Sequence, residues 1–153
     1  MKSVLYVSVA DPELGTDGVH AIVSHSQRRN GADGVTGILL YNGSNFLQLI
    51  EGDPAIIDAC YARIQRDPRH SGVVTLRDMP IGEREFPEWA MRYSLVEQPV
   101  ENTLAAVREA GVPRADTLDR ISAFVGLNRR GPVPHVSAKL EHNYATLVSN
   151  INA

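Results

Sequence analysis

The chain of 153 residues has the length of a single domain, and its 43% hydrophobic and 22% charged residues are typical of a soluble globular protein. A net charge of −3 favours neither nucleic acid nor an anionic membrane as a partner, so we expect neither. The single cysteine, Cys60, excludes an intrachain disulfide, and because no secretory signal or membrane-length apolar run is visible we expect a cytoplasmic protein.

The chain begins with a predicted strand, a loop and an amphipathic helix. Residues 3–10 are rich in β-branched and aromatic side chains and alternate between two faces, which indicates a strand. The helix is predicted over 17–30. Thr16 or Asp17 is placed to cap its start, and Asn30 with the glycine after it is typical of a helix end. Its core-facing stripe consists of Val19, Ile22, Val23 and Ser26.

A hairpin and a second helix follow. Residues 34–41 and 45–51 read as two strands joined by a turn that contains an Asn-Gly pair. Asp53 followed by proline is a strong helix start, and the Asp-Pro pair at Asp67 ends the helix. Its apolar stripe consists of Ile57, Cys60, Tyr61 and Ile64.

Two more strands complete the predicted sheet, one over 71–79 and one over 88–95. The order of elements is then β-α-β-β-α-β-β. This is an α+β arrangement of the ferredoxin-like type, in which one sheet carries two helices on one face.

The pattern changes after residue 96. Amphipathic helices are predicted over 101–111 and 115–128, and a last helix or partner-binding segment over 138–151. This tail is too small to fold alone, so we expect its helices to pack on the sheet or on another chain. We therefore divide the chain into a domain of residues 1–96 and a helical extension of residues 97–153.

A few polar side chains stand inside apolar elements. Gln48 lies in the middle of the third strand, and an amide buried there without partners costs roughly 1–3 kcal/mol. Tyr6 lies in the middle of the first strand and Asn30 at the end of the first helix. Trp89 and Met91 are two residues apart on the predicted fifth strand, which would place them on one face. Taken singly, each of these residues also fits an ordinary core or helix-end position.

Together these residues resemble the BLUF family of blue-light sensors that use flavin. The matching stretches, in chain order, are "LYVS", "SHSQRRNGADGVTGILLY", "FLQLIEGD", "IQRDPRHSGV" and "EREFPEWAM". They cover about residues 3–95 and are specific only in combination.

The resemblance implies a non-covalently bound flavin, FAD with FMN as the other possibility, whose ring lies between the two helices. Asn30 would then bond the carbonyl edge of the ring, and Gln48 would bridge the Tyr6 phenol and the ring. The residues expected to bind the cofactor are Tyr6, Ile22, Ser26, Arg29, Asn30, Phe46, Gln48, Ile64, Asp67, Arg69 and His70. The photoactive switch would consist of Tyr6, Gln48, Trp89 and Met91.

The function implied is that of a blue-light photoreceptor rather than an enzyme. Tyrosine can supply an electron and then a proton, and glutamine can donate and accept hydrogen bonds at once. The signal would pass from Gln48 through the fifth strand to the helices after residue 96. Because 153 residues leave no room for a fused output enzyme, we expect output by contact with a separate regulatory protein or within a homodimer or higher homo-oligomer.

Two other functions stay open at this point, a small flavin-dependent redox enzyme and a ferredoxin-like interaction domain without a cofactor. No nicotinamide-binding motif supports the first of them. A metal site is not expected, because His20 and His25 are five residues apart on a helix and Cys60 has no second cysteine.

Overall fold

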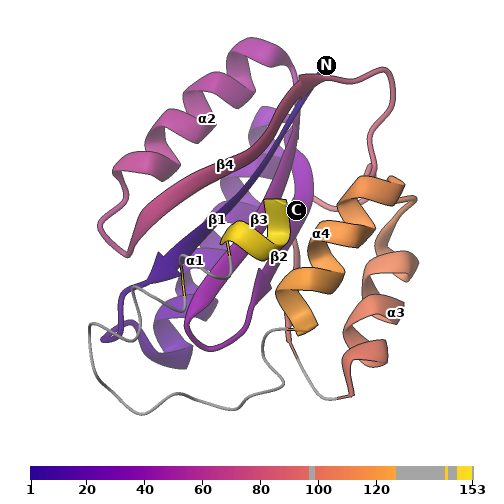
Figure 1. The fold of residues 1–153 in the computed structure, drawn as a ribbon. Coiled ribbons are helices and arrows are strands. Elements are labelled where there is room, and N and C mark those ends of the chain that lie inside the picture. Colours follow the sequence, from indigo (N-terminus) through magenta and orange to yellow (C-terminus); the bar gives the residue numbers. More distant parts are fainter. Residues whose placement is uncertain (97–98, 127–143, 145–147, 153) are drawn as a thin grey trace.

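The computed structural model of the protein describes residues 1–96, 99–126, 144 and 148–152. Its strands are β1 (Lys2–Ala10), β2 (Thr36–Tyr41), β3 (Asn45–Gly52), β4 (His70–Pro80) and β5 (Arg92–Leu95). Its helices are α1 (Gly15–Asp33), α2 (Pro54–Arg66), α3 (Val100–Ala110) and α4 (Ala115–Gly126), labelled in Figure 1. The predicted order of elements is confirmed. Residues 148–152 are helical, and most of the helix predicted over 138–151 lies outside the described residues.

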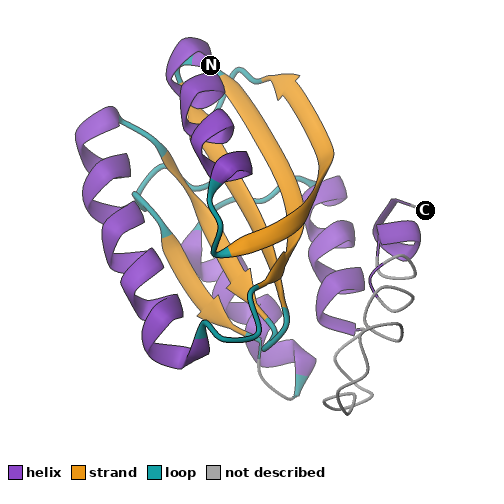
Figure 2. Ribbon diagram, turned by 90° about the vertical axis from the view of Figure 1, so that its left-hand side faces the viewer, coloured by secondary structure: helices purple, strands orange, loops and turns teal. Residues whose placement is uncertain are grey.

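The five strands form one sheet in the order β4-β1-β3-β2-β5. The neighbouring pairs are antiparallel, except that β5 runs parallel to β2 at the edge. Helices α1 and α2 cover one face and α3 and α4 lie against the other, so the sheet is sandwiched between helical layers (Figure 2). The ferredoxin-like arrangement and the packing of the C-terminal helices on the sheet are as predicted.

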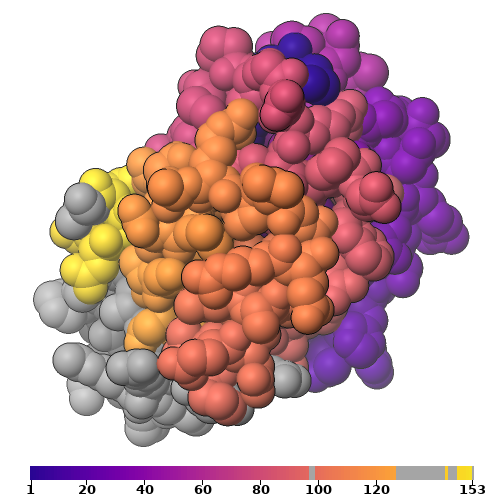
Figure 3. All heavy atoms as spheres, turned by 90° about the vertical axis from the view of Figure 1, so that its right-hand side faces the viewer, coloured from indigo at the N-terminus to yellow at the C-terminus, as the bar shows by residue number. Residues whose placement is uncertain are grey.

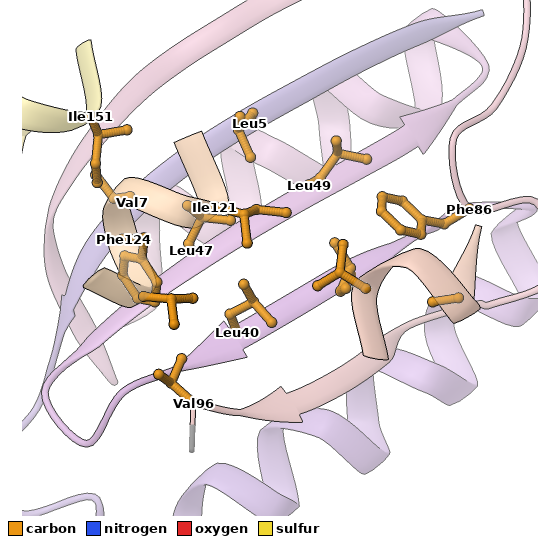
Figure 4. Close-up of a cluster of buried hydrophobic side chains, with 14 of the residues drawn as sticks. Leu5, Val7, Leu40, Leu47, Leu49, Phe86, Val96, Ile121, Phe124 and Ile151 are labelled. Carbon is orange, nitrogen blue, oxygen red and sulfur yellow. The ribbon is translucent and has the colours of Figure 1, made fainter. Parts of the chain in front are cut away.

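The alternation of side chains along β1 divides the interior into two cores. Leu5 and Val7 pack with Ile121 and Phe124 of α4 on one face, and the buried Ile151 joins this cluster (Figure 4). Val4 and Tyr6 point to the opposite face and pack with apolar residues of α1 and α2. On the surface, α3 and α4 abut the segment that precedes β5 (Figure 3).

The ends of α2 follow the prediction, and those of α1 do not. The Asp53 carboxylate accepts hydrogen bonds from the backbone N–H groups of Ala55 and Ile56, as expected of an N-cap. Helix α1 begins at Gly15 without a side-chain cap, so the predicted caps at Thr16 or Asp17 are wrong. It ends before Gly34, which adopts the left-handed conformation (φ 68°). Asn30 therefore lies inside the helix, and it is buried.

The predicted start of the fifth strand is also wrong. Pairing with β2 begins only at Arg92, so Trp89 and Met91 lie in the segment before the strand. They do not share a face: Met91 is 1% exposed and points inward, whereas Trp89 is 37% exposed and lies beneath the Arg92 guanidinium. In this segment the Trp89 carbonyl accepts from the Gly37 N–H at 3.0 Å. The carbonyls of Ala90 and Met91 accept from side chains of α1, so the segment is bonded outside the β2–β5 ladder.

Candidate functional site

A cavity of about 210 Å³ lies between α1, α2 and the sheet. Its lining includes every residue that the sequence predicted as a cofactor contact: Tyr6, Ile22, Ser26, Arg29, Asn30, Phe46, Gln48, Ile64, Asp67, Arg69 and His70. The tertiary structure thus brings together side chains from both helices and three strands. Their binding roles remain predictions. Trp89 and Met91, predicted as members of the switch, do not line the cavity.

Gln48 is satisfied by two side chains, one on each side. Tyr6 and Gln48 are directly opposite each other across β1 and β3, and the Tyr6 hydroxyl donates to Gln48 Oε1. Gln48 Nε2 donates to the sulfur of Met91 at 3.4 Å. A primary amide has two N–H groups and a carbonyl with two lone pairs, so one N–H and one lone pair of Gln48 remain for a ligand.

Burial keeps the Tyr6 phenol protonated. Desolvation raises the pKa of Tyr6 well above 10, and the neighbouring Tyr61, Cys60 and Asp67 act in the same direction. The rings of Tyr6 and Tyr61 lie 5.4 Å apart, and His70 lies edge-on to Tyr6 at 6.2 Å. At neutral pH, Tyr6 therefore has a proton that it can donate to Gln48 or pass on.

Asn30 combines a structural contact with free hydrogen-bonding capacity. Its Nδ2 donates to the Ala90 carbonyl at 2.9 Å, and Gln27 Nε2 donates to the Met91 carbonyl at 3.1 Å, so α1 holds the segment that contains Met91. Among the described residues, the carbonyl oxygen of Asn30 has no protein partner, although the side chain is 95% buried and lines the cavity. A buried amide in that state fits a ligand with its own adjacent donor and acceptor, such as the carbonyl and N–H edge of a flavin.

Asp67, Arg69 and His70 form another part of the cavity wall. The Arg69 guanidinium donates to both Asp67 oxygens, and these hydrogen bonds lower the pKa of the Asp67 carboxyl. His70 uses both ring nitrogens within the protein, with Ser8 Oγ at 2.8 Å and the Ile64 carbonyl at 2.5 Å. Because both ring nitrogens are already bonded, His70 can contact a ligand only through the face of its ring. The sequence had predicted a contact by His70 without saying which atoms make it.

Four lining residues were not predicted as ligand contacts: His25, Leu39, Cys60 and Arg63. Leu39 lies directly opposite Gln48 across β2 and β3, and the alternation of the strands could have identified it. Cys60 was assigned to the apolar stripe of the second helix, and it is buried as that pattern predicts. Nothing in the sequence shows which flank of a helix borders a cavity, so His25 and Arg63 could not be found from the pattern.

Within the described residues, no group of three or more His, Cys, Asp or Glu side chains could hold a metal ion. In the same part of the chain, no helix is long and apolar enough to cross a membrane.

Residues 1–92 match the protein family described as BLUF, sensors of blue light using FAD. The antirepressor BluF of Escherichia coli, regulated by blue light and temperature, is 36% identical over 115 residues, which are 74% of this chain and 28% of that protein. A photoactivated adenylate cyclase subunit beta of Euglena longa is 36% identical over 92 residues, 60% of this chain and 11% of the subunit. The chain thus spans a small part of these curated relatives.

Two solved structures match this chain over nearly the whole of their own length. The BLUF protein BlrB in its dark state superposes with a TM-score of 0.65 at 28% identity, over 97% of this chain and 96% of that one. The BLUF domain of BlrP1 has a TM-score of 0.70 at 28% identity, over 88% of this chain and 95% of that one. The likeness therefore includes the layer of α1, α2 and the sheet that encloses the cavity.

Proposed function

The chain belongs to the BLUF family of flavin-based blue-light sensors, and from this premise we propose that Tyr6 and Gln48 form its light switch. The observation that carries the proposal is the hydrogen-bonded series from Tyr6 through Gln48 to the sulfur of Met91, beside the cavity. A bound flavin would supply absorption of blue light and the capacity to accept an electron. Asn30 would hold its carbonyl edge through the amide groups that the protein leaves free.

The roles of the two switch residues follow from their chemistry. Tyr6 is oxidisable, protonated and aimed at Gln48, so it is the source of both an electron and a proton. Gln48 is neutral and two-sided, and it can exchange which neighbour it donates to without carrying a charge into the core. Rotation and tautomerisation of the amide both change the hydrogen bond between Gln48 and the Met91 sulfur. Either one would therefore transmit the light-induced change to the segment before β5.

An absorption spectrum of the purified protein before and after blue illumination tests this proposal. We expect a yellow protein whose flavin bands shift to the red and return in the dark. A colourless protein after expression with added flavin would favour the cofactor-free interaction domain. Turnover of NADH or NADPH would favour the redox enzyme, since we propose that the chain is a sensor module without catalytic activity.

We propose FAD rather than FMN as the natural cofactor. A second, more open hollow adjoins the cavity and shares Arg63, Asp67 and Arg69 with it, adding Arg66 and Pro68. Asp67 is neutralised by Arg69, and Arg63 lies 3.8 Å from Asp33. Arg29, at the cavity itself, has no acidic partner among the described residues. This cationic surface favours a diphosphate that extends beyond the cavity.

Arg66→Ala is expected to raise the Kd for FAD roughly twofold to tenfold, because Arg66 is exposed, lines only the outer hollow, and would lose a hydrogen bond to phosphate with a net value of about 0.5–1.5 kcal/mol. The Kd for FMN, which lacks the second phosphate and the adenosine, should not change. Titration of apoprotein with each flavin measures both constants. Arg28→Ala is the matched control, since Arg28 is exposed and lines neither hollow. An equal effect on FAD and FMN would contradict the assignment.

We propose that output passes by contact to a separate regulatory protein, or through rearrangement of a homodimer or higher homo-oligomer, in the cytoplasm. The signal would pass from Met91 along residues 85–91 to α3 and α4, on the face of the sheet opposite the cavity (the far face). Several contacts support it: Glu85 accepts hydrogen bonds from the backbone N–H of Arg114 and from Thr117 at the start of α4. The division of the chain at residues 96 and 97 also remains a proposal.

Met91→Ala is expected to leave flavin binding and the red shift largely intact but to weaken the response of the far helices, because the sulfur that receives the Gln48 N–H is gone. Light-minus-dark hydrogen exchange over residues 100–126 measures the response. Met79→Ala, on the edge strand β4, is the matched control. A light response in α4 as large as that of the unmodified protein would show that the route is misplaced.

A further inference from the structure

The ladder between β1 and β4 is irregular beside the switch. The register shifts between Leu5 and Tyr6 and again between Val7 and Val9. At each shift β4 has one residue more than β1, so the consecutive residues Tyr6 and Val7 lie between two irregularities. Gly72 lies at the second shift with φ 60°, a left-handed conformation that suits glycine. Regular pairing of β1 with β4 is therefore interrupted directly before Tyr6 and again after Val7.

Tyr144 bonds both strands at the second irregularity, from the face of the sheet that packs against α3 and α4. Its hydroxyl donates to the Val7 carbonyl at 3.2 Å and to the Gly72 carbonyl, so one phenol proton is shared between the two strands. Its ring packs on Gly72, where an added Cβ would lie 3.2 Å from Cε1. Burial raises the pKa of Tyr144 to about 12, so the phenol remains a donor at neutral pH.

The same region of β1 is held from the cavity side. Ser8, the next residue after Val7, binds Nδ1 of His70 at 2.8 Å, and His70 in turn lies against the Tyr6 ring. Tyr144 and Val148 pack against the far-face core that also contains the buried Ile151. The part of β1 that directly follows Tyr6 is thus fixed on one side by cavity residues and on the other by Tyr144.

We propose that Tyr144 is a positioning residue for the Tyr6–Gln48 switch, acting through β1 and setting the rate at which the switch relaxes in the dark. The inference rests on the proposed function, since it requires a flavin that responds to light. The chain from phenol to switch is short: Tyr144 holds the Val7 carbonyl, Val7 follows Tyr6, and Tyr6 donates to Gln48. A looser β1 lets the pair rearrange more easily.

Tyr144→Phe tests the inference, because it removes the hydroxyl and keeps the ring. We expect flavin binding and the size of the red shift to persist, whereas dark recovery accelerates roughly twofold to tenfold, the factor that one net hydrogen bond supports. Amide exchange over residues 71–74 should increase as well. Tyr93→Phe is the matched control, since the Tyr93 hydroxyl has no hydrogen bond among the described residues.

Gly72→Ala provides a second variant that disturbs the same contact from β4, in case the first fails to fold. Recovery is followed well below the melting temperature, so that a merely structural effect on stability leaves the rate unchanged. Recovery equal to that of the unmodified protein in the variants that fold would overturn the inference, as would failure of both variants to fold. If the unmodified protein binds flavin but does not shift, the switch proposal fails instead.

Discussion

Replacing Gln48 with leucine is expected to leave a yellow protein whose flavin bands no longer shift under blue light. Leucine fills a similar volume but cannot accept from Tyr6 or donate to Met91, so both hydrogen bonds of the switch disappear. The loss should be complete, because no other side chain among the described residues bridges Tyr6 and Met91. Absorption spectra before and after illumination measure it.

Tyr6→Phe should have the same outcome by a different route. It keeps the ring on the cavity wall but removes the proton and makes the side chain much harder to oxidise. Gln65→Leu is the control for the glutamine change, since Gln65 is exposed on α2 and does not line the cavity. A normal, reversible shift in either switch variant would rule out the mechanism.

Glu85→Ala is expected to lower the free energy of unfolding by about 3–5 kcal/mol, the range found when one partner of a buried ion pair is removed. Glu85 is 2% exposed, and one of its oxygens accepts from Arg77 Nη2 at 2.8 Å. The Arg77 side chain is only 8% exposed, so alanine at position 85 leaves a buried cation whose remaining acidic partner among the described residues is Asp116. The start of α4 also loses its acceptor.

Urea denaturation measures this loss, and the melting temperature should fall by roughly 6–20 °C, at about 2–4 °C per kcal/mol for a domain of this size. Asp58→Ala is the control. Asp58 pairs with Lys2 at 2.5 Å on the surface, and such exposed pairs contribute about 1 kcal/mol or less. A loss below about 1 kcal/mol for Glu85→Ala would show that the buried pair is not a net stabilising contact.

A second buried carboxylate holds the same segment. Glu51 is fully buried, and it accepts from the backbone N–H groups of Glu85 and Phe86 at 2.8 and 2.7 Å. Burial raises the pKa of the Glu51 carboxyl despite these bonds. Two carboxylates more than thirty residues apart in the chain thus anchor the segment that leads to Met91, and no local pattern in the sequence indicates that they meet.

Local patterns predicted well where the determining interactions are themselves local. The hairpin of β2 and β3 and the start of α2 at Asp53 follow from turn residues and an N-cap, which act within a few positions. The ends of α1 were wrong although its observed C-cap at Gly34 is itself local, since two Gly residues offered alternative ends. The start of β5 was wrong because it depends on distant groups. In particular, the Trp89 carbonyl is held by Gly37, more than fifty residues earlier.

The sequence by itself determined the order of the elements and the two faces of the sheet, because strand and helix periodicities assign each side chain to a side. Most residues around the cavity were indicated by the resemblance to the BLUF family, not by periodicity. Only the tertiary structure decided that Met91 points inward and Trp89 outward, and that Tyr144 reaches Val7. It also decided that the Asn30 carbonyl oxygen has no partner among the residues the structure describes. These outcomes depend on contacts between segments far apart in the chain. Periodicity reports only on neighbours along the chain, so it cannot show which side chain such a contact will fix.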